Sequence, residues 1–193
     1  MFTAVRLLLL FVHVVSFATA LGCVLREDAK LLSRQPFDPD SLQTAARTVR
    51  LALILLWVSG LALIAFDTGG ALDRLIDKPK LLAKLTVVCV LTLNGVALHI
   101  LVFPALVGNG PRPGHTASVA AFLGAISAVS WMSATLLGIA PPVAKWWGYG
   151  DIVVGYITAL ALGITFALVV VRPRIMRKLQ AGEDCPMTVR APL

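Results

Sequence analysis

Long apolar runs separated by short polar segments dominate the chain. A helix needs about 20 apolar residues to cross the roughly 30 Å hydrocarbon core of a bilayer. Five runs reach that length, and no hydrophilic stretch between them is long enough to form a separate soluble core. The pattern predicts an all-α integral membrane bundle, a single domain over 1–193, with transmembrane helices over about 2–24, 49–66, 82–106, 116–139 and 149–171.

Turn and capping residues lie between the runs. Asp40 or Ser41 is expected to cap the start of the second helix. The segment 67–70, which ends in two glycines, is expected to close that helix, because glycine readily adopts a left-handed conformation. Arg6, the first apolar run and the small residues 18–20 also fit a cleavable signal peptide. The length of the run, the histidine inside it and the basic segment that follows favour a retained helix.

Charge supports a membrane location and predicts an orientation. Only 14% of the residues are charged, whereas a soluble domain carries about a quarter. The net charge of +7 comes from basic residues at the ends of apolar runs, which is typical of loops facing anionic lipid rather than of nucleic-acid binding. Eleven basic residues fall on one side of a five-helix bundle and six on the other. The bias predicts a bacterial inner-membrane protein with its N-terminus outside and a basic cytoplasmic tail over 172–193.

Small residues repeat at intervals of four in the last two runs: Ala117, Ala121 and Ala125, then Gly155, Ala159, Gly163 and Ala167. Small side chains let helix backbones approach closely where no hydrophobic effect draws helices together. This pattern predicts packing of the fourth helix against the fifth, with a homodimer contact as the alternative.

Two histidines lie deep inside apolar runs, His13 in the first and His99 in the third. An ionisable side chain in hydrocarbon costs free energy and marks a partner, a proton path or a cofactor. At about 100° per residue, His13 shares a helix face with Arg6 and Ser16. A neutral imidazole is a good ligand for a metal or for haem iron, so His13 and His99 are candidate ligands. The structural alternative is a hydrogen bond from each imidazole to a serine or a backbone carbonyl of a neighbouring helix.

The third run carries a polar stripe that includes its histidine. Lys84, Thr92, Gly95 and His99 follow steps that keep them on one helix face. We expect this face to meet the His13 face in the interior of the bundle, where Lys84 is a candidate cofactor contact. The alternative for Lys84 is that its charged end extends to the membrane surface.

The first run also reads His13-x8-Gly22-x3-Arg26, and the third opens with Lys80-Leu-Leu-Ala-Lys84 and continues to Asn94-Gly95. This arrangement resembles the HemJ-type protoporphyrinogen oxidases and the CopD-like proteins, which are small polytopic membrane proteins. The resemblance implies a helical bundle that binds haem b, with His13, Arg26 and Lys84 as counterparts of functional residues. Asn94-Gly95 stands where the HemJ type has a Tyr-His pair, so the resemblance does not imply oxidase activity.

Three functions fit these features. The favoured one is a non-enzymatic scaffold or assembly subunit, whose partners would be membrane lipid and either a second copy of the chain or another membrane protein. The alternatives are a haem b-binding redox or porphyrin-related protein, and a small ion or solute transporter with Lys84, Thr92 and His99 along its path. The cysteine spacing matches neither a zinc site nor covalent haem attachment, and nucleic acid is not an expected partner. The sequence does not decide between an enzyme and a non-enzyme.

Overall fold

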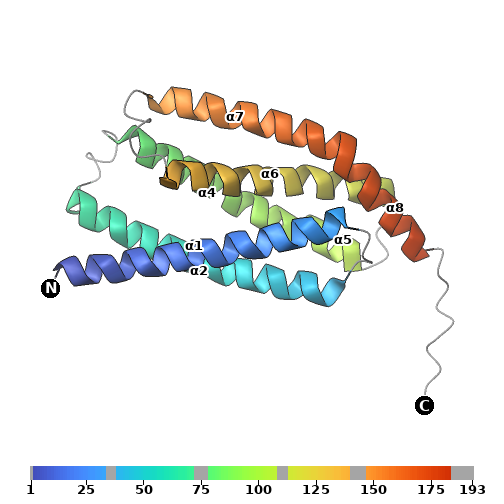
Figure 1. The fold of residues 1–193 in the computed structure, drawn as a ribbon, viewed down its shortest axis with the longest axis horizontal. Helices are drawn as coiled ribbons and strands as arrows, with labels where there is room; N and C mark the ends of the chain where they lie inside the picture. Colours follow the sequence, from blue (N-terminus) through green and yellow to red (C-terminus); the bar gives the residue numbers. More distant parts are fainter. Residues whose placement is uncertain (1, 34–37, 72–77, 108–112, 140–146, 184–193) are drawn as a thin grey trace, which may run out of the picture.

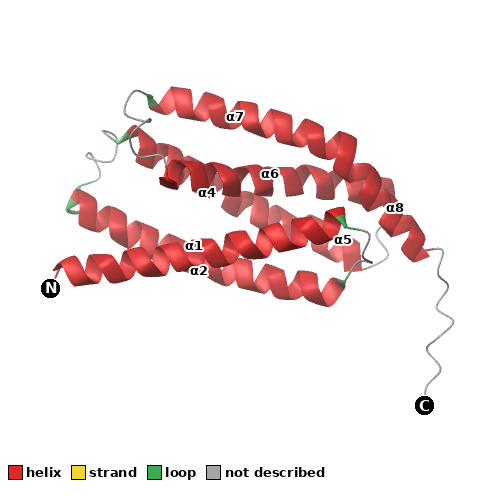
Figure 2. Cartoon of the chain, viewed as in Figure 1, coloured by secondary structure: helices red, strands yellow, loops and turns green. Residues whose placement is uncertain are grey.

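The computed structural model describes residues 2–33, 38–71, 78–107, 113–139 and 147–183. Within these ranges the chain forms helices and no strands (Figure 2), which confirms the predicted all-α class. The elements in order are α1 (Phe2–Leu32), α2 (Pro39–Thr68), α4 (Pro79–Ala97), the π-helical turn η1 (Leu98–Val102), α5 (Phe103–Val107), α6 (Pro113–Ile139), α7 (Tyr149–Phe166), the π-helical turn η3 (Ala167–Val171) and α8 (Arg172–Glu183).

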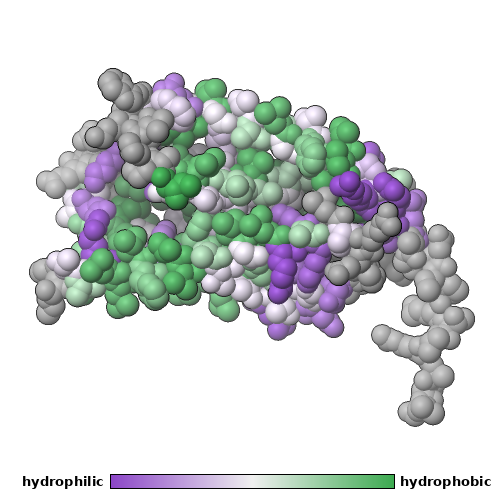
Figure 3. Space-filling view, in the orientation of Figure 1, coloured by the Kyte–Doolittle hydropathy of each residue, from purple (hydrophilic) through white to green (hydrophobic). Residues whose placement is uncertain are grey.

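Five helical segments are long and apolar enough to cross a membrane: Thr3–Lys30, Asp40–Thr68, Pro79–Ala105, Gly114–Ile139 and Tyr149–Gln180. Large apolar side chains such as Phe11, Leu93 and Ile139 point outward. In the space-filling view, apolar residues cover most of the visible middle of the molecule and hydrophilic residues gather toward its two ends (Figure 3). This distribution suits a bundle surrounded by lipid, because lipid tails are as apolar as these side chains.

The helices extend beyond the predicted spans, most clearly at the start of α2. Asp38, rather than Asp40 or Ser41, is the N-cap, and its carboxylate accepts hydrogen bonds from the backbone N–H groups of Asp40 and Ser41. Pro39, which follows, has no backbone N–H to satisfy, and its backbone angle suits the first helical turn. The helix therefore begins earlier in the chain than predicted. The predicted end is confirmed, since Gly69 closes α2 with φ of +65°.

Two π-helical turns interrupt the helices, and each comes just before a proline. Pro104 follows η1, and Pro173 follows η3. A proline in a helix lacks an N–H and clashes with the carbonyl of the residue four positions earlier. A wider turn relieves that conflict. Neither π-helical turn was predicted from the sequence.

The predicted basic segment over 172–193 is helical at its start. Residues 172–183 form α8, and 184–193 lie outside the described part of the chain. The helix continues because Ile175 is buried in a cluster with Ala117, Ala121, Ala125 and Ala167. α8 therefore packs on α6.

The helices form two packed groups (Figure 1). α1 and α2 are an antiparallel hairpin, while α4, α7 and α8 pack on α6. The predicted packing of the fourth helix against the fifth is confirmed: a Cβ added at Gly163 would lie 2.5 Å from Val129 Cγ2 of α6. Gly155, at the other end of the same stripe, has no neighbouring atom within 4 Å of such a Cβ.

Candidate functional site

Polar contacts set the register of the α1–α2 hairpin. Arg6 Nε donates to Asp67 Oδ1 at 3.1 Å near one end. At the other end, Lys30 binds Ser41 and, at 3.1 Å, Glu27. Because these contacts hold both ends of the hairpin, they define which residue of α1 lies opposite which residue of α2 along its whole length.

His13 is bound to α2 within this hairpin. Ser59 Oγ donates its proton to the carbonyl of Leu55 at 2.6 Å, so it accepts from His13 Nδ1 at 2.9 Å. This pair of bonds places a proton on His13 Nδ1. A Cβ at Gly60 would lie 3.2 Å from His13 Cε1, so the ring lies against the backbone of α2. A hydrogen bond from His13 to a serine is the structural alternative that the sequence offered to a ligand role for this histidine.

Lys84 belongs to the surroundings of His13. Its half-buried ammonium interacts electrostatically with His13 and with Lys80. Arg6, on the same face of α1 as His13, pairs with Asp67 of α2. Among the described residues, the polar face of α1 is thus satisfied mainly by α2.

His99 lies elsewhere, in the π-turn η1. Its imidazole is exposed and meets the ring of Phe103 edge-on, with centroids 4.9 Å apart. No described contact joins His99 to His13. The expectation that the two histidine faces meet in a buried interior is therefore wrong for His99.

Arg26, the fourth candidate, lies in a polar cluster near the end of α1. Its guanidinium binds Glu27 Oε1 at 3.2 Å and is largely exposed. Glu27 also accepts from Lys30 and Ser41. The negative charge of Glu27 is consequently balanced within this cluster.

A groove of about 360 Å³ separates the α1–α2 hairpin from α4, η1 and α6. Its walls are mostly apolar, and its polar lining residues are Cys23, Glu27, Asp28, Arg50, Trp57, Thr92, His99 and Ser127. Gly95 and Gly124 also line it, and a Cβ at either would meet no atom within 4 Å. Cavities of about 300–1,000 Å³ with apolar walls and a few polar groups are typical ligand sites.

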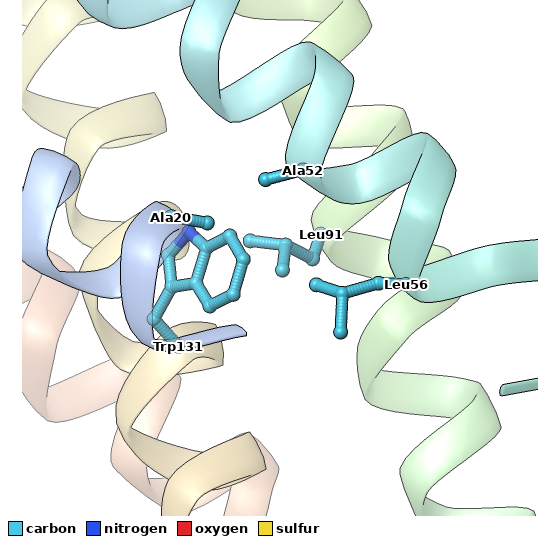
Figure 4. Packing of buried hydrophobic residues seen from close by; sticks show 5 residues of the cluster. All are labelled: Ala20, Ala52, Leu56, Leu91 and Trp131. Atoms are coloured by element: carbon cyan, nitrogen blue, oxygen red, sulfur yellow. The ribbon is translucent and has the colours of Figure 1, made fainter. Parts of the chain in front are cut away.

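Trp57 and Thr92 form a polar bridge near the apolar end of the groove, where Trp57 Nε1 donates to Thr92 Oγ1 at 3.0 Å. Along α2 the lining extends from Trp57 to Leu42, a length of about 22 Å at 1.5 Å per residue. The groove is therefore long and narrow for its volume. Buried Trp131 of α6 lies beside it and packs against Ala20, Leu56 and Leu91 (Figure 4).

Charged residues mark the edges of the apolar part of α2. No charged residue lies between Arg50 and Asp67, a distance of about 26 Å along the helix. That distance is close to the thickness of a hydrocarbon core. Arg50 consequently marks one edge of the apolar layer, and the groove crosses that edge.

The height of the other polar groups follows from the Trp57–Thr92 bond. Arg50 on α2 is seven residues from Trp57, and His99 in η1 is seven residues from Thr92 in the same direction. Both residues therefore lie about 10 Å from the Trp57–Thr92 bond along the helix axes. Asp28 lies near Leu42, because its neighbour Glu27 binds Ser41. Measured along the axis of α2, Asp28 is thus about 12 Å beyond Arg50. The lining of the groove therefore runs from an apolar end at Trp57 past Arg50 and His99 to an acidic end at Glu27 and Asp28.

The donor set does not fit a haem held between the two histidines. His99 lines the groove, whereas His13 is outside its lining and has its Nδ1 bound to Ser59. Among the described residues, no group of three or more His, Cys, Asp and Glu side chains could hold a metal ion. Lys84 and Arg26 are also outside the groove lining. The geometry thus separates the residues that the haem hypothesis joins.

Several residues that build the groove were missed by sequence reasoning. Trp57 and Trp131 lie in apolar runs, where an aromatic side chain carries no distinctive signal. Asn94, only 5% exposed, precedes the lining residue Gly95 and holds α4 to α6 by donating to the carbonyl of Leu123 at 3.0 Å. Arg50 was counted only as a basic boundary residue. Its position just before a long apolar run was the available signal.

Comparison with protein-family models, curated proteins and solved structures finds no match for this chain. The resemblance to HemJ-type and CopD-like proteins therefore stays a prediction.

Proposed function

We propose that this protein is a non-enzymatic membrane protein that holds a chain-like amphipathic lipid in the groove between its α1–α2 hairpin and α4–α6. The single observation that carries the proposal is the groove itself, whose lining is mostly apolar with charged residues toward one end. A molecule with a hydrocarbon chain and a polar end matches both parts. Its hydrocarbon chain would lie along the groove residues Trp57, Gly95 and Trp131.

The other candidate functions have less support from the geometry. The small-residue stripe behind the scaffold hypothesis is used internally at Gly163 and Ala167. A polar path from Lys84 through Thr92 to His99 is interrupted, because the Thr92 hydroxyl donates to Val88 and accepts from Trp57. Haem ligation by both histidines has less support, because no described contact joins His13 to His99.

The first test fills the groove without disturbing the fold. Gly95→Leu is expected to reduce the lipid that remains bound after purification in a mild detergent by about tenfold, since the added side chain enters open groove space. Native mass spectrometry of the protein extracted from its membrane measures the lipid-bound fraction.

The matched control for this test is Gly155→Leu on α7. Gly155 also has no atom within 4 Å of an added Cβ, but it is not a groove residue. This variant should retain lipid as the wild type does. An unchanged lipid-bound fraction in Gly95→Leu would show that the groove is not the binding site.

We also propose that the protein lies in a bacterial inner membrane with its C-terminus in the cytoplasm. The basic residues on both sides of the α1–α2 connection and those of α8 support this orientation through the positive-inside rule. In a variant without the native cysteines, Trp147→Cys should react with a membrane-impermeant maleimide on cells whose outer membrane is permeabilised. Gln180→Cys should react only after lysis, because α7 and α8 place the two exposed positions at opposite ends of the last span. The reverse labelling pattern would invert the proposed topology.

A further inference from the structure

Two charged groups of the groove lack a partner in the part of the chain that the structure describes. Arg50 is exposed and makes no hydrogen bond or ion pair there. Asp28 is half-buried, also without a hydrogen bond or ion pair, and its charged neighbour is the like-charged Glu27. Glu27 differs from Asp28 because Arg26 and Lys30 balance its charge.

The two groups have opposite charges and lie in a defined order along the groove. Arg50 lies at the edge of the apolar layer, at the height of His99, and Asp28 lies at the acidic end of the groove. The backbone heights of Arg50 and Asp28 differ by about 12 Å, and the long arginine side chain can extend along the groove toward Asp28. A ligand that meets both groups carries an anion near the hydrocarbon edge and a cation farther out.

The chemistry of each group narrows the ligand further. A guanidinium presents a planar fork of donors that matches two oxygens of a phosphate. His99, on the opposite wall at the same height, can add one donor from its imidazole. An isolated aspartate accepts hydrogen bonds, and a primary ammonium supplies three N–H donors together with a compensating charge. Hydrocarbon chain, phosphate and ammonium occur in this order in a phospholipid with a primary-amine headgroup.

We propose that the groove selects a phospholipid with a primary-amine headgroup, such as phosphatidylethanolamine, with its phosphate on Arg50 and its ammonium on Asp28. This inference rests on the proposed lipid-binding function and adds the headgroup that the site recognises. Phosphatidylglycerol presents the same phosphate, but beyond it only neutral hydroxyl groups, so it offers Asp28 hydrogen bonds without a compensating charge. Phosphatidylcholine carries a quaternary ammonium without N–H donors, so it forms no hydrogen bond with the carboxylate.

The experiment compares these three lipids on the full chain. Delipidated protein in detergent receives equal amounts of phosphatidylethanolamine, phosphatidylglycerol and phosphatidylcholine with identical acyl chains, and native mass spectrometry measures the bound fraction of each. The wild type should favour phosphatidylethanolamine over phosphatidylglycerol by about tenfold. Asp28→Asn should bring that ratio close to one, whereas Arg50→Gln should weaken the binding of all three lipids.

Asp40→Asn and Arg47→Gln are the matched controls. Both residues are exposed on α2, and neither lines the groove. They should keep the wild-type preference. Equal binding of the three lipids to the wild type, or an unchanged ratio in Asp28→Asn, would overturn the headgroup assignment.

The two proposals fail in different ways. If Gly95→Leu loses lipid but the Asp28 and Arg50 variants bind as the wild type does, the groove holds a lipid without selecting its headgroup. If Gly95→Leu also binds lipid like the wild type, the groove is not the lipid site and both proposals fail.

Discussion

Replacement of Trp131 by alanine is expected to lower the free energy of unfolding by about 3 kcal/mol. The indole is 2% exposed and joins α6 to the α1–α2 hairpin, with its ring centroid 5.4 Å from that of Phe17. Lipid tails are as apolar as a protein core, so the loss arises mainly from van der Waals contacts that the cavity removes. Unfolding of the purified protein in detergent, by heat or by titration with a denaturing detergent, measures the change.

The same variant should loosen the hairpin. Cys23 is half-buried and lines the groove, so its alkylation should become faster when Trp131 no longer holds α1 in place. This rate is measured in a variant that keeps Cys23 as its single cysteine. Trp147→Ala is the control, because Trp147 is 54% exposed and its loss should change stability by no more than about 0.5 kcal/mol. Equal effects of the two substitutions would mean that Trp131 does not hold the hairpin.

Gly163→Leu is expected to cost about 1–3 kcal/mol by overpacking. Its Cβ alone would lie 2.5 Å from Val129 Cγ2, and a longer side chain forces α7 away from α6. The separation should also disturb the neighbouring cluster that buries Ala167 and Ile175. The same unfolding measurement in detergent detects this loss.

The neighbouring glycine of the stripe provides the control for Gly163. Gly155→Leu meets no atom within 4 Å at its Cβ and should leave stability unchanged or slightly raised, since glycine is a poor helix former. Val129→Ala should restore part of the stability lost in Gly163→Leu, because it removes the opposing methyl groups. A Gly163→Leu protein as stable as wild type would show that α6 and α7 do not meet at this point.

The sequence by itself determined the helices of this protein. An apolar run of about 20 residues is a local property, and the glycines after α2 end that helix regardless of what surrounds it. The small-residue stripe likewise indicated that the fourth and fifth spans pack together, which the Gly163–Val129 approach bears out. The exact helix ends were harder to predict, because Asp38 followed by Pro39 forms a better N-cap for α2 than Asp40 or Ser41.

The tertiary structure decided which polar residues meet. Helical periodicity places Lys84, Thr92 and His99 on one face, but it does not specify which neighbour covers each part of that face. Lys84 lies near His13, Thr92 binds Trp57, and His99 reaches the groove. The choice of neighbours depends on helix crossing and rotation, which follow from close packing at sites distant in sequence. Those same contacts left the space beside Gly95 open between the hairpin and α4, and no single run of the sequence encodes that groove.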